Sequence, residues 1–336
     1  MTKKGFLMKV SPARLHGSTV SYLCELGLGT EDAVLIADHL VDAECAGYPS
    51  HGLMRLTGIK AVSSGFGRVA EPRVVATGGG IKLYEADGQL GIVAMSRAIE
   101  VAIAEADENN LVMVGVRGYV GTTGMIGAYA RRAAANGLVA LIMCHSEYAV
   151  APHGGRRAIL GTNPIAIGIP SETTPFVADL ATSAWSYGDL RVAMREGRTV
   201  PEGVVQTVDG RPSTDPNDAD NGSQLPMAGH KGYALGLAVE ILCGAFVGGK
   251  IGRDAAPGGD AALAIVFRED AIQPKATVES AISALLAEVK SAPLAYGFDA
   301  IRVPGEGSDS NRRKVAEAGF LDVDDNLLDS LGLTIA

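Results

Sequence analysis

Residues 111–116 read LVMVGV and residues 138–144 read LVALIMC, and between them lie a glycine-rich turn and a helical pattern over residues 127–135. Short apolar runs of this kind are typical of strands buried inside a sheet. A strand, a helix and a second strand in succession predict a layered α/β body. Further strands are expected at residues 165–169, 176–180 and 262–267, and further helices at residues 90–106, 231–246 and 277–290.

The first 60 residues read as helices that precede this body. One of them is expected to start with Thr30 as its N-cap and to end near Gly47. Because Pro49 forbids easy continuation, a further helix is expected to begin at Ser50 and to carry Arg55. The chain therefore combines a helical N-terminal portion with an α/β body.

The composition is that of a globular enzyme, with 47% apolar and 20% charged residues among 336. The formal net charge is −9 and no run rich in lysine or arginine stands out, so a nucleic-acid partner is not expected. The four cysteines show no CxxC spacing and indicate reduced thiols in a cytoplasmic protein. The chain opens without an apolar signal-peptide core, and no apolar run reaches about 18 residues, so no membrane partner is expected.

The familiar catalytic signatures are missing from the sequence. No GxGxxG motif follows the first strand, and there is no Walker A, HExxH or GxSxG motif. The nearest glycine pattern, at residues 121–124, has a different spacing. The sequence therefore does not support a classical Rossmann domain, a P-loop enzyme, a zinc protease or a serine hydrolase.

The polar segment at residues 48–55 reads YPSHGLMR and is the first candidate site. His51 can exchange a proton near neutral pH. Arg55 lies four residues further on, so a helix would place it on the same face, where it could pair bidentately with a carboxylate. The plainer interpretation is a Ser50 N-cap, an exposed histidine and a surface arginine, and from the residues alone it is the commoner case.

Four other polar segments lie between apolar elements, at residues 152–164, 179–189, 229–233 and 303–307. Hydroxyl and backbone N–H groups at a strand end can hold a phosphate or a ribose. Lys231, at a helix start, is unfavourable for the helix dipole and indicates an anionic partner. Plain loops, helix caps and a solvated lysine are the alternatives.

Taken in order, these segments resemble the malate/L-lactate dehydrogenase family of the second type. That family also contains sulfolactate and ureidoglycolate dehydrogenases and Δ1-piperideine-2-carboxylate/Δ1-pyrroline-2-carboxylate reductases. The matching pieces are SHGLMR at 50–55, LGTNP at 160–164, DLATS at 179–183, PSTDP at 212–216, HKGY at 230–233 and PGE at 304–306. The likeness covers nearly the whole chain. It implies a sulfolactate dehydrogenase-like fold, that is, a non-Rossmann mixed sheet body with helices on its faces and a helical N-terminal portion, and a homodimer with the active site near the subunit interface.

The imino acid reductase branch is the most similar one, and it implies a role for each residue that matches. Ser50, His51 and Asp189 are expected to be catalytic, and Arg55 to hold the substrate carboxylate, with Thr122 and Thr162 as further substrate-binding residues. Because an adjacent carboxylate favours imidazolium, Ser50 and Asp189 are expected to orient His51 and raise its pKa. The expected cofactor-binding residues are Ser146, Asp179, Leu180, Ala181, Thr182, Ser183, His230, Lys231, Pro304, Gly305 and Glu306.

One departure from the family concerns the turn after the strand at 111–116. The family commonly has a histidine there, and in ureidoglycolate dehydrogenases that histidine is the proposed base. Here the turn reads RGYVGTTG at residues 117–124, with Thr122 at or near the histidine position. This loss argues against ureidoglycolate dehydrogenase activity and indicates a reshaped substrate pocket.

The expected function is reduction of a small cyclic imino acid of the Δ1-piperideine-2-carboxylate or Δ1-pyrroline-2-carboxylate type at C2. The expected cofactor is NADPH, with NADH as the other possibility, and Arg156, Arg157 and Arg191 are candidates to meet a 2′-phosphate; no metal is needed. The alternatives are a 2-hydroxy acid/2-oxo acid dehydrogenase of the malate, lactate or sulfolactate type, and a non-catalytic binding protein that retains the fold. The expected portions are an N-terminal helical portion at 1–75, an α/β portion at 76–110 and 275–336, and a cofactor-binding domain at 111–274.

Overall fold

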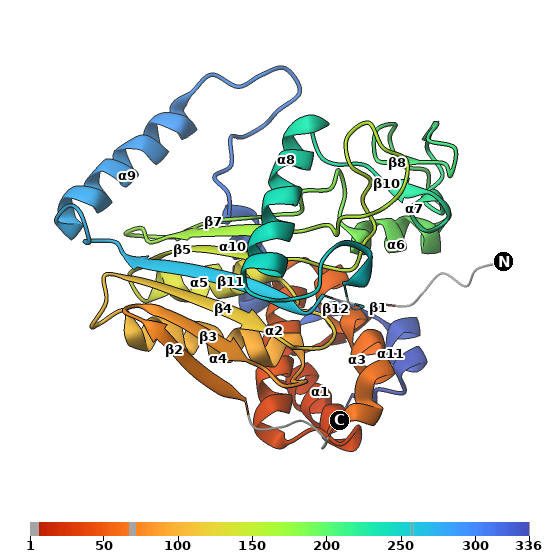
Figure 1. The fold of residues 1–336 in the computed structure, drawn as a ribbon, viewed down its shortest axis with the longest axis horizontal. Coiled ribbons are helices and arrows are strands. Elements are labelled where there is room, and N and C mark those ends of the chain that lie inside the picture. The colour runs from red at the N-terminus through yellow and green to blue at the C-terminus, as the bar shows by residue number, and fades with distance from the viewer. Residues whose placement is uncertain (1–6, 67–71, 256, 258, 336) are drawn as a thin grey trace.

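The computed structural model describes residues 7–66, 72–255, 257 and 259–335. Within these residues a seven-stranded sheet has the order β2-β3-β4-β11-β5-β6-β7 (Figure 1). β3 and β4 are parallel, whereas all other neighbours are antiparallel, so the sheet is mixed as expected. The strands are β2 (Arg73–Gly78), β3 (Ile81–Glu85), β4 (Leu111–Arg117), β5 (Leu138–Cys144), β6 (Ile165–Ile169), β7 (Phe176–Leu180) and β11 (Ala261–Arg268).

The strands predicted from apolar runs are all present, and β5, β6 and β7 have the predicted bounds. β11 lies between β4 and β5, so that Ala264 faces Val114 on one side and Ile142 on the other. These three residues are fully buried. Helices cover both faces of these central strands, which explains why their sequences are continuously apolar rather than alternating.

One face of the sheet is covered by α4 (Gly91–Glu105) and α5 (Ile126–Ala135), both close to their predicted positions. Met95, Ile99 and Tyr129 from these helices belong to the largest buried cluster, together with residues of the central strands. The core between these two helices and the sheet therefore supports both elements that border the turn from β4 to α5.

The opposite face carries α8 (His230–Val239), which continues without a break into the π-helix η4 (Glu240–Phe246). Figure 1 shows α8 above the sheet and α4 beneath it. Val239 and Cys243 are buried against Leu263 of β11. The predicted helix over residues 231–246 is thus present, although its second half has π rather than α geometry.

The N-terminal portion is helical as predicted and contains α1 (Pro12–Glu25) and α2 (Thr30–Ala46). The expected N-cap of α2 is corrected by one residue, because Gly29 is the cap and Thr30 is the first helical residue. Gly47 ends α2 in the left-handed conformation with φ +87°, as glycine does at many helix ends.

The helix expected to begin at Ser50 is wrong. Two 3₁₀ turns, η1 (Pro49–His51) and η2 (Leu53–Arg55), come first, and α3 (Leu56–Val62) follows them. Gly52 separates the two turns with φ −90° and ψ −134°, a non-helical backbone. His51 and Arg55 therefore lie on two separate short turns instead of on one helix face.

The C-terminal segment returns to the N-terminal helices. β12 (Leu321–Asp324) pairs antiparallel with β1 (Leu7–Val10), and α10 (Glu306–Ala318) packs against α2. α11 (Asp325–Leu331) adds Leu328 and the last turn to the buried N-terminal cluster. Neither the strand pair nor these two helices were predicted.

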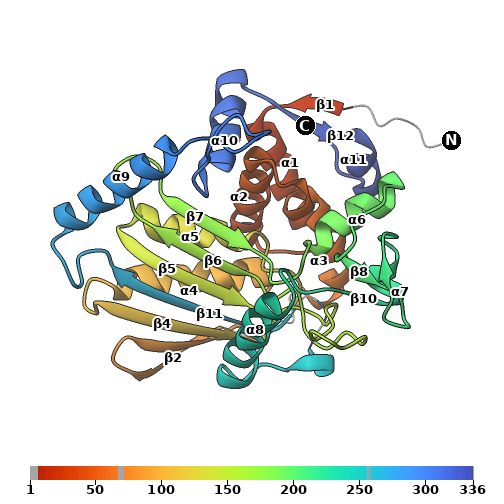
Figure 2. The ribbon, with the colours of Figure 1, turned by 90° about the horizontal axis from the view of Figure 1, so that it is seen from above.

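Short elements border the far end of the sheet, where β8 to β10 form a small sheet that lies near α6 in Figure 2. They are η3 (Ser63–Gly65), α6 (Tyr187–Glu196), β8 (Val205–Gln206), β9 (Pro212–Ser213), α7 (Asp218–Asn221), β10 (Ser223–Gln224) and η5 (Gly252–Asp254).

The helix predicted at 277–290 is present as α9 (Lys275–Ser291), but none of its residues is buried in this chain. Figure 1 shows α9 standing away from the body. No helix of the described residues is long and apolar enough to cross a membrane.

Candidate active site

A cleft of about 1430 Å³ opens where the ends of β5 and β7 and the turn after β4 meet η1, η2 and α6. Pockets for a single drug-sized ligand measure roughly 300–1,000 Å³, so this cleft has room for a dinucleotide and a small substrate together. The predicted site residues that line it are Ser50, His51, Arg55, Thr122, Ser146, Thr162, Asp179, Leu180, Ala181, Ser183 and Asp189.

The Ser50–His51 pair is the polar centre of this cleft. The hydroxyl Oγ of Ser50 lies 3.1 Å from Nδ1 of His51. The turn rests on Glu44 of α2, whose carboxylate accepts a hydrogen bond from the Leu53 N–H at 2.8 Å. A Cβ on Gly52 would overlap with the Glu44 carboxylate. Glycine at position 52 therefore lets the backbone that follows His51 approach Glu44 closely.

The structure lowers the pKa of His51 to about 3, chiefly because burial disfavours the charged imidazole, with further contributions from Arg55 and His39. The expectation that Asp189 raises this pKa is wrong, because Asp189 is not among the groups that act on His51. Its carboxylate instead accepts a hydrogen bond from the Ser186 hydroxyl at 2.8 Å. At neutral pH the free protein therefore holds His51 as a neutral imidazole.

Arg55 presents an incompletely paired guanidinium to the same cleft. Its Nε is buried and has no hydrogen-bond partner within the described residues. Burial lowers the pKa of Arg55, while the nearby charge of Asp189 raises it. A desolvated guanidinium with an open donor is suited to a planar oxyanion, which supplies both the countercharge and the missing acceptor.

Asp189 lies in the first turn of α6, where the Ser186 hydroxyl accepts a hydrogen bond from its N–H at 3.1 Å. The preceding Gly188 packs directly on the Ser50–His51 turn, since a Cβ there would lie 2.7 Å from Cβ of Ser50. α6 thus supports Ser50 from the side, and the charge of Asp189 acts on Arg55 rather than on the imidazole.

The turn that contains Thr122 is held by a histidine that the sequence did not single out. Thr122 Oγ1 accepts a hydrogen bond from the Gly124 N–H at 3.0 Å. Nε2 of His39, a buried residue of α2, accepts one from the Met125 N–H at 2.8 Å. Burial lowers the pKa of His39 to about 4, so it stays a neutral acceptor. His39 lies on the apolar side of an ordinary helix, and no motif marks it.

Ser146 and Thr162 form one cluster of hydroxyl groups at the end of β5. The Thr162 N–H donates to Ser146 Oγ at 3.0 Å, and the two hydroxyl oxygens are 3.2 Å apart. Thr182 lies beneath them, 2% exposed, and its hydroxyl donates to the carbonyl oxygens of Thr162 and Asn163. Thr182 therefore braces the cluster and does not line the cleft itself.

Asp179 joins the end of β7 to the start of α5. Its Oδ2 accepts a hydrogen bond from the Gly127 N–H at 2.7 Å, at the helix end that favours negative charge. The surrounding protein displaces water and raises the pKa of Asp179 to about 6, while the Gly127 hydrogen bond opposes this shift. The residue is nevertheless open to the cleft.

The remaining predicted cofactor residues lie outside this cleft within the single chain. His230 and Lys231 are exposed at the start of α8. Glu306 begins α10, and its carboxylate accepts hydrogen bonds from Lys290 Nζ at 2.6 Å and from the Val303 N–H at 3.1 Å. The other two residues of this set are Pro304 and Gly305.

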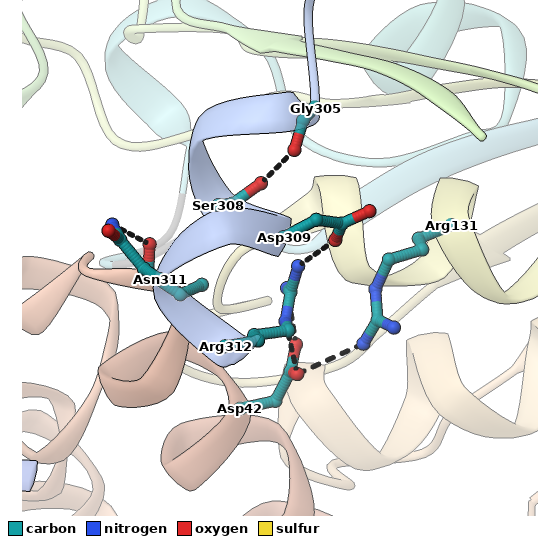
Figure 3. A network of polar contacts seen from close by, with 8 residues as sticks. Asp42, Arg131, Gly305, Ser308, Asp309, Asn311 and Arg312 are labelled. Atoms are coloured by element: carbon teal, nitrogen blue, oxygen red, sulfur yellow. Dashed lines mark hydrogen bonds and ion pairs between the residues drawn. The ribbon is translucent and has the colours of Figure 1, made fainter. Parts of the chain in front are cut away.

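α10, which begins at Glu306, is clamped to α2 (Figure 3). Arg312 donates two hydrogen bonds to the carboxylate of Asp42, at 2.7 and 2.8 Å. The side chain of Asn311 donates to the carbonyl oxygen of Ala46 at 3.0 Å. Because α2 ends at Ala46, just before η1, this clamp fixes the backbone from which Ser50 and His51 project.

Three cleft residues, Tyr148, Trp185 and Arg253, were missed because they lie in irregular loops or short turns without a recognisable pattern. The guanidinium of Arg253 lies over the ring of Tyr148, 4.6 Å from its centroid. Trp185 also lines the cleft, as does Arg157, one of the three arginines expected near a 2′-phosphate. These side chains add positive charge and aromatic surface to the cleft.

Comparison with known proteins places the chain among dehydrogenases. The sequence profile of the malate/L-lactate dehydrogenase family matches residues 10–332. The L-sulfolactate dehydrogenase of Methanocaldococcus jannaschii is 34% identical over 334 residues, covering 96% of this chain and 95% of that protein. The NAD(+)-dependent ureidoglycolate dehydrogenase of Escherichia coli K12 is 31% identical and covers 95% of this chain and 93% of that protein.

Solved structures show the same relationship. The sulfolactate dehydrogenase structure from Methanocaldococcus jannaschii superposes with a TM-score of 0.87 at 30% identity and covers 98% of both chains. The Δ1-piperideine-2-carboxylate reductase of Pseudomonas syringae pvar. tomato superposes with a TM-score of 0.82 at 28% identity, covering 97% of this chain and all of that chain. The sulfolactate dehydrogenase-like fold is confirmed.

Proposed function

Because this chain belongs to the malate/L-lactate dehydrogenase family and is an NAD(P)-dependent oxidoreductase, we propose that it catalyses hydride transfer to or from the C2 carbon of a small carboxylate in this cleft. The proposal rests on one observation: the Ser50–His51 pair and Arg55, whose buried Nε has no partner among the described residues, line the same cleft. Arg55 binds the carboxylate, and this places C2 beside the imidazole. When bound, a reduced nicotinamide supplies the hydride.

A cyclic imino acid is the substrate class that this cleft suits best. With a pKa of about 3, only about one in 10⁴ His51 side chains carries a proton at pH 7. A ketone needs a proton for its developing alkoxide, and Thr122 offers no imidazole in its place. A protonated imine carries its own proton, so hydride addition at C2 yields a neutral amine directly. Ser50 and His51 then need only to orient the nitrogen by hydrogen bonds.

A 2-hydroxy acid is the second candidate, favoured by the same neutral imidazole working in the oxidative direction. If Nδ1 of His51 donates to the Ser50 hydroxyl, Nε2 keeps a lone pair and can accept the substrate hydroxyl proton. Sulfolactate and malate dehydrogenases, to which this chain is similar, are named for substrates of this type. A non-catalytic role has no comparable support.

The cofactor chemistry fits residues at the strand-end side of the cleft. The hydroxyls of Ser146, Thr162 and Ser183 and the carboxylate of Asp179 are donors and acceptors of the kind that bind ribose and amide groups. We propose NADPH, with Arg157 meeting the 2′-phosphate. Arg157 lines the cleft, whereas the other two candidates are engaged, Arg156 with Asp209 and Arg191 with Asp220.

We further propose a homodimer in the cytoplasm. Exposed apolar side chains follow the outer face of α8 and η4, where Leu235, Ile241 and Phe246 are 43%, 52% and 65% exposed. Tyr296 and Phe298, after α9, are also exposed. Surfaces of this kind mark protein interfaces, and His230 and Lys231 at the start of α8 would then lie beside the partner. The cysteines are free, as in a reducing compartment.

Steady-state kinetics test this proposal. The catalytic efficiency kcat/KM is measured with Δ1-piperideine-2-carboxylate, Δ1-pyrroline-2-carboxylate, pyruvate and oxaloacetate, each with NADPH and with NADH. A preference of about 100-fold for an imine, roughly 2.7 kcal/mol of transition-state binding, supports the imino acid assignment. The same preference for an oxo acid selects the hydroxy acid alternative. Turnover of none of the four contradicts the proposed substrate classes.

A further inference from the structure

Asn163 occupies an unusual position directly behind the Ser146–Thr162 cluster. It is fully buried, and its φ of +38° is one of the few positive values at a non-glycine residue in the described chain. A non-glycine residue keeps such a conformation only where its surroundings impose it, and such positions gather at functional sites. Glycine would adopt this backbone more easily, so the asparagine side chain is the feature to explain.

Both the oxygen and the nitrogen of the Asn163 side-chain amide are hydrogen-bonded. Its Oδ1 accepts from the Ser146 N–H at 3.2 Å. Its Nδ2 donates to the carbonyl oxygen of Gly236 in α8 at 2.8 Å and to Oε2 of Glu240 at 2.8 Å. One amide group therefore links the loop after β5, the loop before β6 and the helix on the far face.

Glu240 continues this network to a third loop of the cleft. It is 5% exposed and is the first residue of the π-helix η4, a geometry often found at functional sites. Its Oε1 accepts from the Gly252 N–H at 2.7 Å, and within the described residues no lysine or arginine pairs with it. Gly252 precedes Arg253, which lines the cleft. A buried carboxylate without a cation depends on these hydrogen bonds.

We infer that Asn163 and Glu240 are positioning residues that hold the Ser146, Thr162 and Arg253 loops in the arrangement that binds the cofactor. The inference rests on the proposed function, since that function places the cofactor against Ser146 and Thr162. Neither residue touches the cleft. Both act through the loops, because each carries a hydrogen bond to the backbone of a loop that does.

The test replaces Glu240 by glutamine, which keeps the shape but turns one acceptor into a donor. In Glu240→Gln, the new amide faces either the Asn163 amide or the Gly252 N–H, so one donor opposes another in either orientation. The loops then spend less time in the binding arrangement, and the apparent Kd rises by the same factor. An increase of about 10-fold in the Kd for NADPH is expected, which corresponds to one unsatisfied buried hydrogen bond.

Binding is followed by the fluorescence of Trp185, the single tryptophan of the sequence, which lines the cleft. Glu317→Gln is the matched control, because Glu317 is exposed on α10 away from the cleft, and its Kd should equal that of the wild type. The melting temperature Tm of each variant is recorded in parallel. A wild type that binds neither NADPH nor NADH contradicts the proposed function itself. A wild type that binds, with Glu240→Gln lowering Tm but leaving Kd unchanged, overturns only the positioning role.

A rescue experiment gives the inference a predicted sign. Asn163→Asp alone places a carboxylate against Oε2 of Glu240 and should weaken binding more than about 10-fold. In the double variant Asn163→Asp/Glu240→Gln, the glutamine amide donates to the aspartate, and the net charge returns to that of the wild type. The double variant should bind NADPH more tightly than Asn163→Asp. Equal or weaker binding by the double variant contradicts the inference, and this comparison holds even where Glu240→Gln alone does not fold.

Discussion

Replacing Arg55 by methionine removes the proposed carboxylate clamp while keeping much of its length and apolar stem. In the structure, Nε of Arg55 is buried and has no partner among the described residues, so a bound carboxylate would complete its hydrogen bonding. A hydrogen bond to a charged group contributes about 1.5–3 kcal/mol, so a bidentate pair contributes about 3–6 kcal/mol. The expected loss in kcat/KM is therefore about 10²–10⁴-fold.

The assay compares each substrate with its carboxamide. The wild type should prefer the carboxylate strongly, whereas Arg55→Met should treat carboxylate and carboxamide alike, because the group that distinguishes them is gone. Arg55→Lys keeps the charge without the planar fork and should fall between the two. The reasoning is refuted if Arg55→Met keeps kcat/KM within about 3-fold of the wild type, or if its preference for the carboxylate is undiminished.

Three further predictions concern the pKa values of His51 and Asp179 and the stability of the turn at Gly52. Since the pKa of His51 lies near 3, its imidazole NMR signals should keep their neutral shifts from pH 8 down to about pH 5; an inflection near pH 6.5, assigned by comparison with His51→Gln, would contradict the burial argument. The pKa of Asp179 is raised to about 6 from 3.8, its ordinary value, so the free energy of unfolding should fall as the pH rises between these two values. Asp179→Asn should flatten this part of the pH dependence measured by urea unfolding, and an unchanged slope would count against the shift. Gly52→Ala should push the Glu44 side chain off the Leu53 N–H, lower the free energy of unfolding by about 1–3 kcal/mol and reduce activity. Gly17→Ala, in open space within α1, should not destabilise the protein. Equal effects of the two changes would show that the close approach of Gly52 to Glu44 is unimportant.

The middle of the sheet could be predicted from sequence because β4, β5 and β11 are largely buried and therefore continuously apolar. β5, β6 and β7 were bounded correctly by apolar runs that end in turn residues. The β2–β3 hairpin was missed, since its residues are largely exposed and lack a continuous apolar run. The pairing of β1 with β12 joins the two ends of the chain, and no local pattern records such a partner. The division into three portions stays a prediction.

The site was predictable only where the sequence carries a motif. The pattern around residues 50–55 located Ser50, His51 and Arg55. The prediction that they share one helix was wrong, because the backbone at Gly52 is not helical and lies against the Glu44 side chain. The sign of the His51 pKa shift also required the structure, since burial and not a neighbouring carboxylate dominates it. Glu240 supports the cleft from the opposite face of the sheet, a relation that spacing along the chain does not encode.

Deuterium labelling can show whether hydride passes to C2 of a substrate whose carboxylate is held by Arg55. The protein is given Δ1-piperideine-2-carboxylate with a reduced nicotinamide cofactor that carries deuterium at its transferable C4 position, and the product is examined by NMR. We expect deuterium at C2 of the product with the wild type and much slower labelling with Arg55→Met. Product without deuterium at C2, or labelling at the same rate in both proteins, would contradict this expectation.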